Sequence, residues 1–259
     1  MPVRLMTLLT GLGLLVACST SPTGRSQLVL MPDSQMQQMG LQAFTSIKQK
    51  TPVDKSRTTN AYVQCVASAI TREVGGNWEV VVFKDDSANA FALPGRKIGV
   101  HTGLLTVAKN QDQLATVIGH EVAHVLSRHS NERVSQKFVV EQGVGLIDAV
   151  ASPSSGTGRA VMGLLGVGAQ FGIIMPFNRA QESEADTYGL KLMARAGFDP
   201  RESVNLWINM GKTRNGQPPE FLSTHPSHST RITDLQRHMG AAMEIYQKAR
   251  RAGKRPACG

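Results

Sequence analysis

One short stretch of the sequence, residues 116–126, constrains this chain more than any other. It contains His-Glu-Val-Ala-His, and on a helix His120 and His124 project from one face, about 40° apart around the axis. Two imidazoles at that spacing can bind one metal ion, and Glu121, displaced by about 100°, can reach a water on the metal without binding the metal itself. The flanking residues are nearly all apolar, which predicts a buried helix with no structural use for three polar side chains. The stretch therefore predicts a metal site with Glu121 as general base.

A hydrolytic zinc site needs a third protein ligand and an open fourth position. In the metzincin pattern a glycine and a histidine would follow, but Ser127 and Ser130 stand at those positions, which excludes that class. His129 is the other histidine nearby. It lies about 140° around a continuous helix from His124, so we expect it at the protein surface and not at the metal.

The third ligand is expected in a later segment, residues 178–189. Asn178 and Gln181 form a capping-box-like helix start, after which Glu182 and Asp186 lie four residues apart on one face. Glu182 can bind zinc while Asp186 reaches a ligating histidine or the reacting group. Glu184 points in another direction and is the alternative ligand. Acidic residues in a first helical turn are ordinary when taken alone, so the combination with the two histidines carries the prediction.

These residues resemble those of the zinc metalloendopeptidases of the HtpX and CAAX-prenyl-protease type. The resemblance covers about residues 35–240 and includes the stretch 89–103, as well as Thr-His-Pro at 224–226 followed by Arg231. Its nearest branch is that of the periplasmic lipoproteins of the LoiP and BepA type. The long transmembrane helices of the other branches have no counterpart in this sequence, so prenyl-protein processing is not expected.

The resemblance implies a mostly helical α+β fold, a gluzincin-type zinc metalloprotease domain with a small sheet, over residues 33–247. It implies one Zn²⁺ per chain, held by His120, His124 and Glu182 with a water in the fourth position. It also implies a catalytic role for Asp186, often stated as proton donor, whereas the local geometry favours an orienting contact with a histidine N–H. Both roles for Asp186 remain open.

His225 lies in the matching Thr-His-Pro frame, in a loop between predicted helices. A neutral imidazole from a loop could occupy the open metal position and keep the site closed, or it could donate a hydrogen bond to the oxyanion. The alternative is a turn histidine that bonds backbone carbonyls, and His228 is a second candidate outside that frame. Of the two active roles, we expect the gate.

Patterning along the rest of the chain predicts helices over residues 33–50, 58–74 and 229–252, and strands over residues 78–84, 90–93 and 97–101. Asn110 and Gln113 begin the helix that carries His120. An extended segment before such a helix can pair with a substrate backbone as an added strand. Residues 136–175 alternate between apolar and Gly- or Ser-rich stretches, which predicts two helices joined by a flexible loop near the cleft.

Residues 1–17 have the pattern of an export signal, with Arg4 before an apolar stretch that is too short to span a bilayer. The stretch ends in Leu-Val-Ala before Cys18, which resembles a bacterial lipobox and implies cleavage before Cys18 and lipidation of that cysteine. Ser19 follows in place of an aspartate, which favours the outer membrane, with residues 18–32 as a polar tether. The alternative is an ordinary export signal followed by a chance cysteine.

The net charge of +9 suits contact with anionic membrane surfaces and equally suits solubility. No nucleic-acid-binding motif accompanies it, so nucleic acid is not an expected partner. None of the three cysteines sits in a Cys-x-x-Cys pair, which argues against cysteine-ligated zinc. With Cys18 lipidated, we expect Cys65 and Cys258 to form a disulfide that ties the basic tail, residues 248–259, to the helix of Cys65. Two free thiols are the alternative.

The sequence therefore predicts a zinc-dependent metalloendopeptidase that cleaves misfolded or misassembled cell-envelope proteins. It would be anchored through Cys18 to the outer membrane and face the periplasm, with protein substrates and the membrane as its partners. The alternative is a periplasmic assembly factor or chaperone whose zinc site mainly holds the fold. A purely structural site usually has four protein ligands and gives Glu121 no task, which favours the peptidase.

Overall fold

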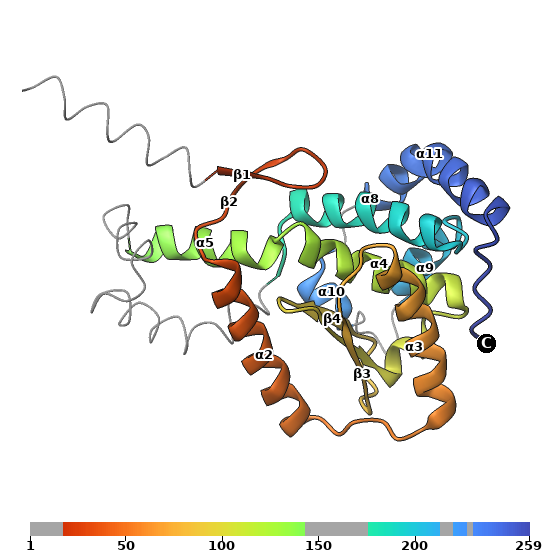
Figure 1. Ribbon diagram of the computed structural model, residues 1–259, viewed down its shortest axis with the longest axis horizontal. Coiled ribbons are helices and arrows are strands. Elements are labelled where there is room, and N and C mark those ends of the chain that lie inside the picture. Colours follow the sequence, from red (N-terminus) through yellow and green to blue (C-terminus); the bar gives the residue numbers. More distant parts are fainter. Residues whose placement is uncertain (1–17, 143–175, 213–219, 227–229) are drawn as a thin grey trace, which may run out of the picture.

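The computed structural model describes residues 18–142, 176–212, 220–226 and 230–259 (Figure 1). In this part of the chain helices surround a small three-stranded sheet, which is the predicted α+β, mostly helical architecture. The expected signal peptide at 1–17 and most of the predicted helical pair at 136–175 lie outside the described residues, as does His228.

The described elements are, in chain order, β1 (Cys18–Thr20), β2 (Ser26–Leu28), α2 (Asp33–Lys50), α3 (Arg57–Arg72), β3 (Glu79–Phe83), β4 (Ala90–Leu93), β5 (Lys97–His101), the 3-10 helix η1 (Thr102–Thr106), α4 (Gln111–Leu126), α5 (His129–Gln142), α8 (Arg179–Ala196), α9 (Glu202–Met210), α10 (Phe221–Thr224) and α11 (Arg231–Arg251). Strands β4 and β5 have the predicted bounds, and the other predicted elements end within two residues of the prediction.

The sheet places β4 at an edge, beside the helix that carries the histidine motif. Its strand order is β3-β5-β4, with β3 parallel and β4 antiparallel to β5. The turn between β4 and β5 includes Gly95, whose φ of +84° lies in the left-handed region that glycine tolerates. The N–H of Ala92 on β4 donates to the Glu121 carboxylate at 2.9 Å, so the edge strand and the motif helix are joined directly.

Helix α4 is the buried centre of the fold, as its apolar sequence predicts. Asn110 caps it by accepting a hydrogen bond from the Gln113 N–H, and the residues from Gln113 to His124 are all buried. It crosses α8 at two glycines. A Cβ on Gly189 would lie 2.8 Å from the backbone nitrogen of His120, and a Cβ on Gly119 would lie 3.0 Å from the Gly189 carbonyl oxygen. The two backbones therefore touch, which brings the polar residues of both helices together.

The chain turns sharply between α4 and α5. Helix α4 ends at Leu126, and Arg128 adopts a φ of +53° before α5 begins at His129. The continuous helix assumed in the sequence argument therefore does not exist, and the expectation that His129 lies at the surface is wrong: its exposed fraction is 0%. The turn swings the His129 ring back toward His124.

The N-terminal segment, expected as a polar tether, forms a small antiparallel hairpin in which Cys18 pairs with Leu28. The chain that follows is fastened to α5, because Asn131 accepts from the Met31 N–H at 3.2 Å and donates to the Met31 carbonyl at 2.7 Å. Ser135 accepts from the Leu30 N–H at 2.9 Å. Residues 18–31 are thus part of the folded domain.

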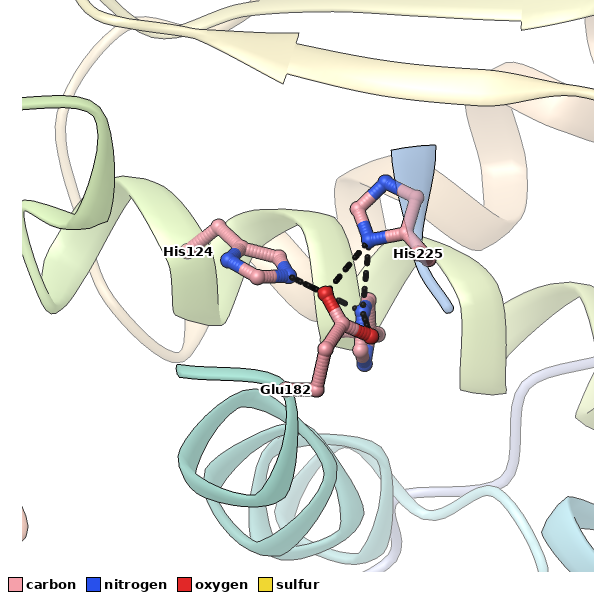
Figure 2. A group of neighbouring side chains, drawn as sticks. His124, Glu182 and His225 are labelled. Carbon is pink, nitrogen blue, oxygen red and sulfur yellow. Dashed lines mark hydrogen bonds and ion pairs between the residues drawn. The ribbon is translucent and has the colours of Figure 1, made fainter. Parts of the chain in front are cut away.

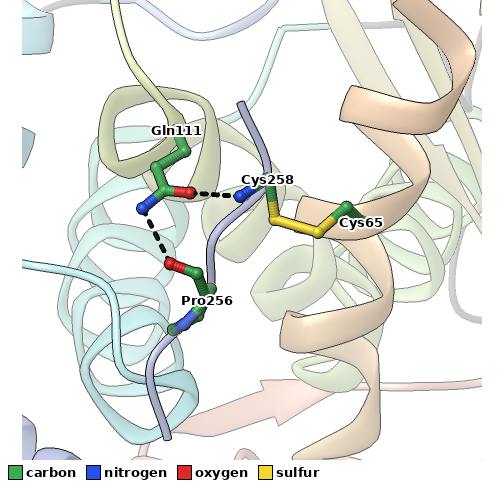
Figure 3. The surroundings of a disulfide bond; sticks show 4 residues. All are labelled: Cys65, Gln111, Pro256 and Cys258. Atoms are coloured by element: carbon green, nitrogen blue, oxygen red, sulfur yellow. Dashed lines mark hydrogen bonds between the residues drawn. A yellow bond between two sulfur atoms is a disulfide. The ribbon is translucent and has the colours of Figure 1, made fainter. Parts of the chain in front are cut away.

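The C-terminal residues are tied to the core on the opposite side. Cys65 on α3 and Cys258 form the predicted disulfide (Figure 3). Gln111, the first residue of α4, accepts from the Cys258 N–H at 2.8 Å and donates to the Pro256 carbonyl at 3.0 Å. Among the described helices, none combines the length and the apolar character that a membrane span requires.

Candidate active site

Four side chains that the sequence predicts as site residues lie together in one buried cluster. His120 and His124 come from α4, Glu182 from the first turn of α8, and His225 directly follows α10. Each offers an atom that lies within 4.8 Å of the others, and none is more than 2% exposed. Figure 2 shows His124, Glu182 and His225 pointing toward one another.

The start of α8 positions Glu182. The predicted capping box is present, because the Asn178 side chain accepts from the Gln181 N–H at 2.9 Å and the Gln181 side chain accepts from the Asn178 N–H. Glu182 follows in the first turn. Its Oε1 lies 3.4 Å from His124 Nε2 and 3.0 Å from His225 Nδ1, and its Oε2 lies 3.5 Å from His120 Nε2.

Asp186 lies one helical turn further along α8 and contacts His120 on the side away from the cluster. Its Oδ1 is 2.9 Å from His120 Nδ1. A carboxylate can only accept there, so His120 carries a proton on Nδ1, and as a neutral imidazole it presents a lone pair at Nε2. This contact is the one that the orienting role of Asp186 requires.

The tautomer of His124 is set by a longer chain of contacts. His129 Nε2 is 3.2 Å from Glu184 Oε2, so His129 carries its proton on Nε2 and offers a lone pair at Nδ1. His124 Nδ1 lies 2.8 Å from that nitrogen and must therefore donate to it. His124 consequently presents a lone pair at Nε2, facing Glu182.

With these tautomers, the donor atoms of the cluster fit a metal ion. The Nε2 atoms of His120 and His124 lie 2.9 Å apart, both with lone pairs, and the Glu182 carboxylate adds further acceptors. Acceptors packed this closely repel one another unless a cation lies between them. Imidazole and carboxylate together are a donor set that zinc prefers, so the cluster fits that metal.

The electrostatics of the cluster agree with that fit. Burial lowers the pKa of His120, but the Glu182 and Asp186 carboxylates outweigh it and raise that pKa to about 10. Burial would raise the pKa of Glu182, yet its contacts with the three histidines hold it well below its ordinary value. Both shifts have the same cause, which is that the carboxylates around these histidines favour a positive charge at this place.

Arg231 was missed as a site residue by the sequence reasoning. It is 1% exposed, its Nε donates to Asp186 Oδ2 at 2.6 Å, and its Nη2 donates to Glu182 Oε2. Its guanidinium also lies 3.9 Å from the Trp207 ring centroid. The residue belongs to the stretch that matched the family, but an arginine in a first helical turn gives no local signal of burial.

Glu121 faces the cluster from α4 with its two oxygens in different surroundings. Oε2 accepts from the Ala92 N–H at 2.9 Å. Oε1 lies 3.2 Å from His225 Nε2, within ion-pair distance, and it has no hydrogen-bond partner among the described residues. Burial raises the pKa of this carboxyl above its ordinary value, while the nearby histidines oppose that shift.

Glu184, the alternative ligand, points away from the cluster toward Thr23, Arg25 and His129. A pocket of about 650 Å³ borders His124. It is lined by the start of α2, residues 76–77, the turn between β4 and β5, the end of α4 and the start of α5. The cluster is therefore buried but has an open space beside it.

Comparison with known proteins gives a consistent picture. The model of Peptidase family M48 matches residues 53–239. The mitochondrial metalloendopeptidase OMA1 of Schizosaccharomyces pombe is 37% identical over 183 residues, covering 69% of this chain and 52% of that protein. The OMA1 of Saccharomyces cerevisiae is 37% identical over 183 residues, with 68% and 51% covered. The beta-barrel assembly-enhancing protease of Yersinia pestis is 34% identical over 162 residues, with 59% and 32% covered. The chain thus spans about half the length of its yeast relatives.

Proposed function

The chain belongs to peptidase family M48, and on that premise we propose that it is a zinc-dependent metalloendopeptidase. The observation that carries the proposal is the Glu121 carboxylate. One oxygen is held by the Ala92 N–H, and the other is left without a hydrogen bond among the described residues, beside a cluster of imidazole lone pairs. A fold-supporting metal site has no use for such a group.

His120, His124 and Glu182 would hold the zinc. When bound, zinc lowers the pKa of a bound water to about 7 and polarises the scissile carbonyl. Asp186 keeps His120 in the tautomer that leaves Nε2 free, and Arg231 holds the Oε2 side of Glu182. These two residues position the ligands and do not need to touch the substrate.

Glu121 moves the proton. Its Oε1 takes a proton from the attacking water and then passes it to the leaving amine. The hydrogen bond from Ala92 fixes the carboxylate plane, and burial raises the pKa of Glu121 above its ordinary value, which makes it a stronger base than an exposed glutamate. An extended peptide would lie along the edge strand β4 and enter the pocket beside His124.

We assign His225 the role of a gate. Its Nδ1 lies 3.0 Å from Glu182 Oε1 and its Nε2 lies 3.2 Å from Glu121 Oε1, so the ring fills the space between ligand and base that water and substrate need. Its place directly after the short helix α10 would let it swing away. The other active role is hydrogen bonding to the oxyanion after such a movement.

The variant His225→Ala separates these roles. A gate predicts that basal cleavage of casein and self-cleavage rise several-fold, whereas an oxyanion donor predicts that kcat falls by about 10²-fold with KM little changed. Wild-type kinetics together with wild-type zinc affinity would contradict both and leave a structural turn histidine.

A second candidate function is an assembly factor or chaperone with a structural zinc site. It is favoured by one observation: His225 brings a fourth protein donor within 4.8 Å of the other three, as closed structural sites have. The two functions differ in what they ask of Glu121, because a structural site would work equally well without its carboxylate.

We further propose that Cys18 is lipidated and that the protein faces the periplasm from the outer membrane, where it cleaves misfolded or misassembled envelope proteins. The support is the lipobox-like sequence before Cys18 and the similarity to proteases named for beta-barrel assembly. Proteomic comparison of envelopes that carry the wild type or Glu121→Gln tests this. Proteins that accumulate only with Glu121→Gln are substrates, whereas identical envelopes that differ from a deletion strain would favour the assembly factor.

A further inference from the structure

A buried polar network lies behind His124, on the side away from the proposed zinc ligands. It contains His129, Glu132, Gln181 and Glu184, none more than 6% exposed. Burying two carboxylates is costly unless a cation and hydrogen bonds compensate for them. The cation is Arg25, which comes from the hairpin loop between β1 and β2.

Arg25 uses its whole guanidinium in this network. Its two terminal nitrogens donate to both oxygens of Glu132 at 2.7 and 2.6 Å, and its Nε donates to Glu184 Oε2 at 2.7 Å. Gln181 donates to Glu132 Oε2 at 2.7 Å from the first turn of α8. The planar guanidinium neutralises the two carboxylates, and its N–H groups point in fixed directions. It therefore holds both carboxylates in one orientation.

Glu184 passes this orientation on to His129. Its Oε1 accepts from the Thr23 hydroxyl at 2.6 Å, and its Oε2 lies 3.2 Å from His129 Nε2. That contact keeps the His129 proton on Nε2 and its lone pair on Nδ1, which is the atom that accepts the His124 Nδ1 proton at 2.8 Å. Each link therefore determines the tautomer of the next.

Removing Arg25, the first residue of this chain of contacts, would change the tautomer of His124. Without Arg25, Glu184 would lose a donor and its counter-charge, and repulsion from the Glu132 carboxylate would turn it away from His129. His129 can then carry its proton on Nδ1, facing His124. In that case His124 must accept at Nδ1 and carry its own proton on Nε2, the atom that has to bind the metal.

We propose that Arg25 is a positioning residue for the metal site: acting through Glu184 and His129, it holds His124 in the tautomer that leaves Nε2 free for the metal. The proposal rests on the proposed function only in that His124 is a zinc ligand. It makes the hairpin that begins at Cys18 part of the active site, although this hairpin lies before the family match at residue 53.

The test is the zinc affinity of the full-length protein, measured by competition with a chromogenic chelator. Arg25→Ala and His129→Phe should each weaken zinc binding by about 10- to 100-fold, the usual effect of losing a group that orients a ligand. Arg25→Lys should also weaken it, because an ammonium cannot reproduce the directed N–H contacts of a planar guanidinium. Should Arg25→Ala fail to fold, Thr23→Val removes a single donor to Glu184 and should weaken zinc binding a few-fold.

Asn131→Ala is the matched control. It loosens the same N-terminal segment by removing both contacts with Met31, and within the described part of the chain the Asn131 side chain bonds only Met31 and Ser135, not the network behind His124. Its zinc affinity should stay within about two-fold of the wild type, well below the 10- to 100-fold loss expected for Arg25→Ala. Equal zinc affinities in the wild type, Arg25→Ala and Thr23→Val would overturn the proposal, as would equal losses in Arg25→Ala and Asn131→Ala.

Two-bond ¹H–¹⁵N NMR of the metal-free protein gives a second readout that mere destabilisation would not move. The wild type should show His124 protonated at Nδ1, and Arg25→Ala should shift that proton to Nε2. An unchanged tautomer in folded Arg25→Ala would contradict the proposal. A wild type that binds no zinc, or a His124→Ala variant that binds it normally, would instead refute the proposed function and this proposal with it.

Discussion

Arg231 is the residue that makes two carboxylates tolerable inside the site. It contacts Glu182 and Asp186 at once and is itself 1% exposed. Removing one partner of a buried ion pair lowers the free energy of unfolding much more than replacing the whole pair by apolar residues, because the remaining charge is left buried and uncompensated. Arg231 therefore influences both the stability of the fold and the direction in which Glu182 points.

We predict that Arg231→Gln lowers the free energy of unfolding by about 3–5 kcal/mol and weakens zinc binding. Urea unfolding of the zinc-free protein measures the first effect, and chelator competition measures the second. Arg237→Gln is the control on the same helix, because its side chain is 67% exposed and its pair with Asp234 should contribute at most about 1 kcal/mol. Equal stability losses in the two variants would contradict the role of Arg231.

The crossing of α4 and α8 is the element-scale feature on which the site depends. Gly119 and Gly189 let the two backbones touch, and the same two helices carry three members of the cluster, His120, His124 and Glu182, as well as Asp186. A side chain at the crossing cannot be accommodated by a rotamer change, since the atoms it would meet are backbone. Helices α4 and α8 can therefore approach this closely only because Gly119 and Gly189 have no Cβ atom.

Gly189→Ala should push α4 and α8 apart, because the new Cβ would lie 2.8–2.9 Å from backbone atoms of Gly119 and His120. We expect a loss of about 1–3 kcal/mol in the free energy of unfolding, as for other overpacked cores, together with weaker zinc binding. Gly240→Ala on α11 is the control: its Cβ would meet nothing within 4 Å, so it should stabilise by about 0.5–1 kcal/mol. Wild-type zinc affinity in Gly189→Ala would contradict this account of the crossing.

The ends of the helices differ in how well the sequence predicts them. Local signals gave the helix starts at Asn110 and Asn178, because a capping side chain and its N–H partner are only three residues apart. The end of α8 has a local cause as well, because its C-terminal cap, Gly197, has a φ of +91°, which glycine tolerates. Helix periodicity cannot place His129, because one left-handed residue, Arg128, ends the helix before His129 is reached.

Contacts between distant segments left no such local signal. Arg25 and Arg231 lie far along the chain from the carboxylates that they contact, and each stands in a stretch that would suit an exposed arginine equally well. His225 was found only through its Thr-His-Pro frame. Helix periodicity could therefore identify the two histidines and pair Glu182 with Asp186, but not the residues that orient them.

At the scale of the whole molecule, both ends of the described chain act on the helix that carries the histidine motif. The hairpin at 18–28 reaches His124 through the network behind it, and the residues after α11 contact Gln111 at the start of α4. The proposed membrane anchor at Cys18 would therefore sit next to a folded part of the domain and not at the end of a loose tether.

We predict that Cys18→Ser moves the exported protein from the membrane fraction to the soluble fraction without changing its zinc content. Buried acyl chains contribute about 0.8 kcal/mol per methylene, and no described helix offers a replacement. A high-salt wash is the control, because the net charge of +9 could also bind anionic lipid and salt screens that attraction. Salt-resistant membrane binding of Cys18→Ser would contradict lipid anchoring at this residue.

The measurement that tests the central claim most directly is peptide cleavage by Glu121→Gln, with zinc content determined on the same sample. Glu121 is proposed to move a proton without holding the metal, so the variant should contain as much zinc as the wild type and cleave casein at least about 10²-fold more slowly. His124→Ala marks the other limit, with both zinc and cleavage lost. Cleavage by Glu121→Gln at the wild-type rate would contradict the assignment of this site as a metallopeptidase centre.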